Sequence, residues 1–191
     1  FVDYFKTIVF GNEGTFCQKY KSEYDVSSFK QALQSYWWEG SDFNSSYKTI
    51  KSFSDVLKNA IKEKDELSAL VSSIKILDWG GVVNRYSVMW LVDAFESNQL
   101  CHSLKLARDI LNSGDDSELY LFENNSPLRS DSATTKLFSL ASNESIIYDD
   151  RVGAAIAIIV RKFLEDNEIN SVPDSLCFMR GPKKRNPSNK Q

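Results

Sequence analysis

The sequence is poor in the residues that build metal centres, clusters and disulfide frameworks. It has three widely spaced cysteines, Cys17, Cys101 and Cys177, and a single histidine, His102. No Cys-x-x-Cys pair occurs, so the spacing supports neither a zinc site nor an iron–sulfur cluster, and we expect no metal and no cofactor. We interpret the cysteines as reduced thiols and, since no secretory signal is found, expect a cytoplasmic protein.

Long apolar runs and internal repeats are also missing. No apolar stretch approaches the roughly 20 residues that a membrane-spanning helix requires, so we expect no membrane partner. Among the 191 residues, 42% are hydrophobic and 26% are charged, the ordinary balance of a globular domain. A chain of this length forms one medium-sized domain or two small lobes.

Positive charge is scarce except at the C-terminus. The formal net charge is −3, but Arg180, Lys183, Lys184, Arg185 and Lys190 lie in a tail without acidic residues. The rest of the chain, residues 1–179, carries 18 basic against 26 acidic side chains, a net charge of −8. Because nucleic-acid affinity depends on local neutralisation of phosphates, the tail is either a nucleic-acid contact or a solvated end.

Apolar residues recur at helical spacing through most of the chain. This periodicity predicts helices over 26–38, 52–62, 67–77, 85–96, 99–111, 132–141 and 149–166, the last being the longest. Residues 118–122 fit either a short strand or a helical turn. We therefore predict an all-α bundle with short connections.

An acidic pair, Asp149-Asp150, opens the helix predicted over 149–166. Its buried face is predicted to consist of Val152, Ala155, Ile156, Ile159, Val160 and Phe163. The orphan amides and the positive dipole end of a helix hold a carboxylate ionised at this position. Such a carboxylate is either an ordinary cap, for which Asp150 is the formal candidate, or an anion that stabilises a developing cation.

The segment Tyr148-Asp149-Asp150-Arg151-Val152 resembles the hydrophobic-Asp-Thr-His-Val signature of the helix-hairpin-helix base-excision DNA glycosylases. More closely, the sequence IYDDRVGAAI is similar to a segment of bacterial proteins with an 8-oxoguanine-glycosylase-like fold, some encoded beside antiviral defence genes. The similarity covers about residues 133–185, with support upstream from Trp79-Gly80. It implies a two-lobed helical fold, with a helical lobe over 1–125, a hairpin-like and Asp-helix region over 126–179 and the basic tail over 180–191.

The resemblance also implies catalytic roles. Lys136, at the start of the helix before Asp149, matches the lysine that attacks the sugar in members with lyase activity, and Asp149 matches the carboxylate that stabilises the cationic sugar. Trp79 is a candidate wall of the base pocket. The interval from Lys136 to Asp149 is 13 residues, shorter than in the family. An alternative is that Lys136 is an ordinary surface lysine.

The resemblance further implies that DNA is the partner. The hairpin glycines whose amides bind a phosphate in the family are missing from residues 127–131. Arg129 would then supply that contact by charge, with Arg151, Lys183, Lys184 and Arg185 as further phosphate contacts. Two alternatives remain, a catalytically inactive module that binds a modified base or nucleotide, and a protein adaptor that docks onto another product of a defence operon.

Overall fold

The computed structural model describes residues 15–18, 21–25, 33–34, 36, 40–123 and 127–177. The chain divides into two compact units. Unit 1 combines Phe1–Phe43 with Asp149–Gln191, and unit 2 is Asn44–Tyr148. Residues 126–148, which the sequence analysis grouped with the Asp149 helix, thus belong to the same compact unit as the helices before them.

Unit 2 is all-helical in its described residues, which confirms the predicted fold class. Its elements are α3 (Phe43–Glu63), α4 (Glu66–Trp79), α5 (Arg85–Glu96), α6 (Leu100–Ser113), the 3₁₀-helix η1 (Asp116–Phe122) and α7 (Thr134–Ala141). The segment that sequence left open between strand and helical turn is therefore helical. Helix α3 begins nine residues before the predicted start. In its first two turns only Phe43, Tyr47 and Ile50, at i, i+4 and i+7, continue the apolar spacing among residues that are mostly polar and exposed.

Short polar caps fix where these helices begin and end. The Asp65 carboxylate accepts the Ser68 amide at 3.0 Å and starts α4, and Asn84 accepts the Ser87 amide at 2.9 Å and starts α5. Gly114, at φ 68°, ends α6 in the left-handed conformation that glycine adopts without strain. These caps satisfy backbone groups that have no partner inside a helix.

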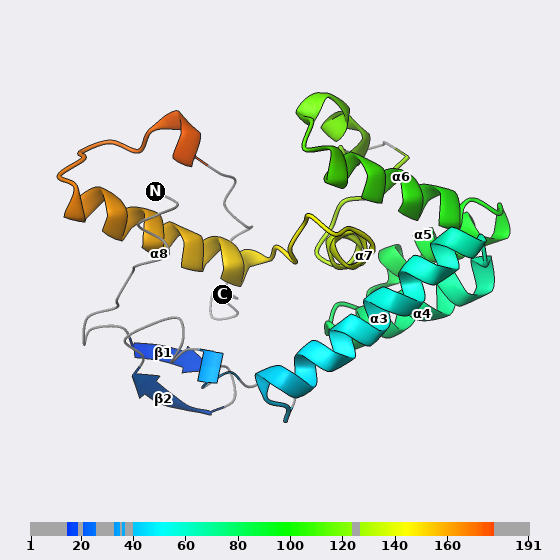
Figure 1. Ribbon diagram of the computed structural model, residues 1–191, viewed down its shortest axis with the longest axis horizontal. Helices are drawn as coiled ribbons and strands as arrows, with labels where there is room; N and C mark the ends of the chain where they lie inside the picture. The colour runs from blue at the N-terminus through cyan, green and yellow to red at the C-terminus, as the bar shows by residue number, and fades with distance from the viewer. Residues whose placement is uncertain are drawn as a thin grey trace, which may run out of the picture. The chain divides into compact units, whose positions relative to one another are not determined.

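Helix α7 supplies much of the core of unit 2. Its residues from Leu137 to Ala141 are all buried, and the Phe138 ring meets Trp90 and Phe122 edge to face, with centroids 6.2 and 5.5 Å apart. Figure 1 shows α7 almost end-on beside α6, and it also contacts α4. A short helix surrounded in this way is held by its neighbours rather than by its own propensity.

Unit 1 contains a β-hairpin that the sequence analysis did not predict. Strands β1 (Thr15–Gln18) and β2 (Lys21–Asp25) are antiparallel, with Phe16 opposite Tyr24 and an irregularity between Phe16 and Gln18. The helix predicted over 26–38 lies almost wholly outside the described residues.

The remaining described elements of unit 1 are α8 (Asp150–Asp166) and the 3₁₀-helix η2 (Asp174–Leu176). The prediction that α8 is the longest helix is wrong, since it has 17 residues and α3 has 21. Ile159 and Val160 are buried as predicted, but Ala155 is exposed, and Leu164 is buried instead. In the described ranges, no helix combines the length and apolar character needed to cross a bilayer.

Candidate functional site

Lys136 lies in the first turn of α7, and its side chain is buried. The residue is only 4% exposed, and its Nζ donates a hydrogen bond to the Ser132 carbonyl at 3.0 Å. The alternative of an ordinary surface lysine is therefore wrong. Lysine is almost never buried to this degree unless its amine has a specific partner or a role, so the position is unusual on physical grounds alone.

The aliphatic part of Lys136 lies against the backbone at the end of α4. A Cβ added to Gly80 would come within 2.8 Å of the Lys136 Cδ and 3.2 Å of its Cε. No other residue fits there without displacing the lysine, and Gly80 has an ordinary right-handed backbone, so close approach is what requires glycine. Trp79, half-buried, immediately precedes Gly80. The fold thus brings the Trp79-Gly80 segment and Lys136 together from separate helices.

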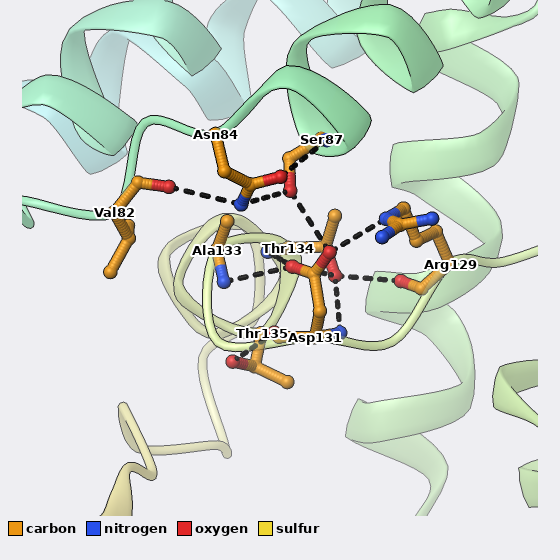
Figure 2. A network of polar contacts seen from close by, with 8 residues as sticks. All are labelled: Val82, Asn84, Ser87, Arg129, Asp131, Ala133, Thr134 and Thr135. Atoms are coloured by element: carbon orange, nitrogen blue, oxygen red, sulfur yellow. Dashed lines mark hydrogen bonds and ion pairs between the residues drawn. The ribbon is translucent and has the colours of Figure 1, made fainter. Parts of the chain in front are cut away.

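A polar network built on Asp131 holds the start of α7 (Figure 2). One carboxylate oxygen, Oδ1, accepts the amides of Ala133 and Thr134, each at 2.9 Å. In return, the Asp131 amide donates to the Thr134 hydroxyl at 3.0 Å, so the two residues cap each other reciprocally. This cap sets the position of the first turn of α7, which carries Lys136.

The other Asp131 oxygen, Oδ2, faces α5 and Arg129. It accepts the Ser87 hydroxyl at 2.9 Å and the Arg129 Nε at 2.6 Å, and Asn84 donates in turn to the Ser87 hydroxyl at 2.8 Å. Burial raises the pKa of Asp131, but the hydrogen bonds from Thr134, Arg129, Ser87 and Ala133 outweigh it and lower the pKa below its usual 3.8. Asp131 therefore stays ionised as the internal anion at this helix start.

The network bears directly on the phosphate contact expected from sequence. Two amides at the N-terminus of α7 already bind the Asp131 carboxylate, which occupies the position that a phosphate takes at an open helix end. Arg129, the expected substitute, pairs with the same carboxylate, and its guanidinium carbon lies 5.8 Å from the centroid of the Tyr86 ring. This role of Asp131 was not predicted from the sequence, although an aspartate just before an apolar helical run is a recognised N-cap signal.

Asp149 caps α8, the second element of the expected site. Its Oδ1 accepts the Val152 amide at 3.1 Å, and its carbonyl accepts the Gly153 amide at 2.9 Å. Asp150 is the first helical residue, so Asp149 rather than Asp150 is the cap. Asp149 belongs to unit 1 and Lys136 to unit 2, and each is described within its own unit.

The other expected contacts are only partly described. The side chain of Arg151 and all of Lys183, Lys184 and Arg185 lie outside the described residues. His102 is exposed on α6. No protein-family model, curated protein or solved structure matches the chain in sequence or in fold.

Proposed function

We propose that this protein is a DNA glycosylase-like enzyme that recognises a flipped or modified base and releases it with Lys136 as the nucleophile. The observation that carries the proposal is the burial of Lys136 at the start of a helix. Its side chain lies against Gly80, which directly follows Trp79 in the sequence. The neutral form of a lysine amine carries the lone pair that attacks a carbon centre.

The chemistry of the proposed step assigns each atom a role. The Lys136 nitrogen forms a bond to the sugar C1′ while the glycosidic bond breaks. The electron pair of the glycosidic bond leaves with the base. The nitrogen then loses a proton that the departing base takes up. As the nitrogen lone pair forms a C=N bond, the C1′–O4′ bond of the sugar breaks and O4′ takes up the remaining nitrogen proton, which gives a Schiff base. Asp149, fixed by the Val152 amide at the start of α8, would stabilise the positive charge on the sugar.

Borohydride trapping tests the role of Lys136. Only an enzyme that forms a Schiff base becomes covalently attached to DNA on reduction, so the parent chain should be trapped on duplexes with a damaged base or an abasic sugar. Lys136→Gln should abolish trapping, whereas Lys75→Gln, an exposed lysine of α4, should leave it unchanged. Lys136→Met, which keeps the apolar stem against Gly80, and a melting curve for each variant separate lost chemistry from lost folding. Undiminished trapping in both Lys136 variants would remove this lysine from the mechanism.

Asp149→Asn tests the proposed electrostatic role. The amide oxygen still accepts the Val152 amide, so the helix cap survives while the charge is lost. Base release should fall by about 10² to 10³, the usual cost of removing one stabilising group at a developing charge. Asp65→Asn, the same change at the cap of α4, is the matched control and should leave base release intact. Equal effects of the two changes would show that Asp149 is only a cap.

A specific observation favours a second candidate, a module that binds a modified base or nucleotide without cutting. The Asp131 carboxylate already takes the α7 amides and Arg129, which reduces the positive charge available to a phosphate at that end. Fluorescence anisotropy with the same duplexes distinguishes the candidates. Binding that prefers a modified base without trapping or base release would favour the module, and release of the base would favour the enzyme.

A further inference from the structure

Helix α4 is apolar on more of its surface than the core of unit 2 covers. Ala69, Ile76 and Leu77 face inward and are fully buried. On the opposite side, Leu67, Val71 and Ile74 are 61%, 42% and 39% exposed, and we call these three residues the α4 stripe. Apolar side chains that gather on one exposed face of a helix mark a surface for contact with a partner, so the stripe is a candidate contact surface.

The spacing within the α4 stripe is that of a helix–helix seam. Leu67, Val71 and Ile74 lie at i, i+4 and i+7, the alternating spacing of four and three residues that lines one side of a paired helix. α4 ends at Trp79, so the seam spans most of its 14 residues. The surface is thus shaped for another helix rather than for a small ligand.

Charges of opposite sign flank the two ends of the α4 stripe. Lys64 lies just before the cap of α4, and Asp78 lies four residues after Ile74, on the last turn. Both are exposed, and within the described ranges neither forms an ion pair. The other charges at the first turn are engaged, because Asp65 caps α4 and the Glu66 carboxylate accepts the Cys101 amide at 3.2 Å. The N-terminal end therefore presents an unpaired cation, Lys64, and the last turn an unpaired anion, Asp78. Lys75, exposed one turn before Asp78, is a further cation beside the stripe, and the described residues give it no ion pair.

We propose that the α4 stripe is a self-association surface that pairs with α4 of a second copy in antiparallel orientation. An antiparallel pair with its two-fold axis at Val71 places Lys64 opposite Asp78 of the partner subunit, and the same contact repeats by symmetry. A parallel pair would instead bring lysine against lysine and aspartate against aspartate. The charges at the two ends of the segment from Lys64, in the turn before α4, to Asp78 are thus complementary to those of the same segment reversed, which selects a second copy of this chain as the occupant.

The surface predicts weak association. One three-turn helix face is smaller than the roughly 800 Å² per partner of a standard stable interface, so dimerisation should depend on concentration and be complete only in concentrated samples. The inference does not depend on the proposed function, because no residue of the α4 stripe belongs to the Lys136 site.

Sedimentation velocity of the full chain across a wide concentration series tests the proposal. The parent should shift from monomer to dimer as concentration rises, and Val71→Glu should abolish the shift. Val56→Glu is the matched control, since Val56 is an apolar residue of α3 with 51% exposure outside the α4 stripe. It should leave the dimer intact. A parent that stays monomeric, or equal effects of the two variants, would overturn the proposal.

A charge swap tests the antiparallel geometry. Lys64→Glu and Asp78→Lys should each weaken the dimer by about tenfold, because two symmetric pairs become repulsive and each surface pair is worth up to about 1 kcal/mol. Combining the two changes restores opposite charges at both ends, so the double variant should return to within about threefold of the parent. Failure of the double variant to recover, or binding of the α4 stripe to a different protein while the chain itself remains monomeric, would refute pairing with a second copy.

Discussion

Removal of the Asp131 carboxylate should destabilise unit 2 well beyond the loss of an ordinary helix cap. Replacing a capping aspartate by alanine costs about 1 kcal/mol. Asp131→Ala also removes the ionised acceptor of the Ser87 hydroxyl and of Arg129, and hydrogen bonds to charged groups contribute about 1.5–3 kcal/mol each when buried. Ser87 is fully buried, whereas Arg129 keeps access to water, so we count one such bond. The sum is about 3 kcal/mol of unfolding free energy.

Chemical denaturation at pH 7, followed by far-ultraviolet circular dichroism, measures this loss. Asp65→Ala is the matched control, because Asp65 is an exposed cap whose carboxylate accepts hydrogen bonds only from Ser68, on the same helix turn, among the described residues. It should cost about 1 kcal/mol. If Asp131→Ala costs no more than Asp65→Ala, the network of Figure 2 adds nothing to capping, and the reasoning is refuted.

The same network gives a pH dependence with a definite sign. Because the pKa of Asp131 is lower in the folded protein than its usual 3.8, its contribution to stability is present above that value and is lost as the pH falls below it. Asp131→Asn should therefore be less stable than the parent at pH 7, and the gap should narrow between about pH 4 and pH 2. The lowered pKa values of Asp65, Asp109 and Asp115 act equally in both proteins and cancel. A constant gap would contradict the assigned role of the charge.

Three further predictions follow from the packing and the charge distribution. Gly80→Ala should cost about 1–3 kcal/mol, because its Cβ would overlap the Lys136 stem, and Lys136→Ala in the same chain should recover much of that loss in melting experiments; an additive double variant would contradict the contact. Cys177 is exposed and should react with a thiol reagent at pH 8, whereas burial and the Glu66 carboxylate raise the pKa of Cys101 to about 11, so peptide mapping should find Cys101 unmodified until the protein unfolds. If DNA binds, ending the chain at Met179 removes all five tail cations, and the loss of the three phosphate contacts of Lys183, Lys184 and Arg185 should make the log–log salt slope shallower by about 2.7; equal slopes would identify the tail as a solvated end.

Helix existence was predictable from sequence because one side of each helix is apolar. The period of 3.6 residues located α4, α5 and α6 to within about two residues, since their buried faces repeat along the chain. The early part of α3 was missed because its apolar period is carried by only three residues, Phe43, Tyr47 and Ile50, among polar ones, and the β1–β2 hairpin was missed because each of its strands has only four or five residues. The type of helix cap was predictable, since an aspartate directly precedes both α4 and α8 and aspartate is a preferred N-cap residue.

By itself, the sequence determined the all-helical character of unit 2 and the capping carboxylate before α8, because these depend on residue types at local spacing. The candidacy of Lys136 rested instead on the resemblance of residues 133–185 to the glycosylase segment. Only the tertiary structure decided that Lys136 is buried, since its side chain packs against Gly80, just after α4 and 56 positions away in the sequence. The tertiary structure also decided that the Asp131 carboxylate accepts hydrogen bonds both from the first amides of α7 and from the Ser87 hydroxyl on α5. Contacts of this kind join residues that are far apart in the sequence and are not related by the helical period of apolar residues. They therefore follow from tertiary packing and cannot be predicted from the sequence pattern.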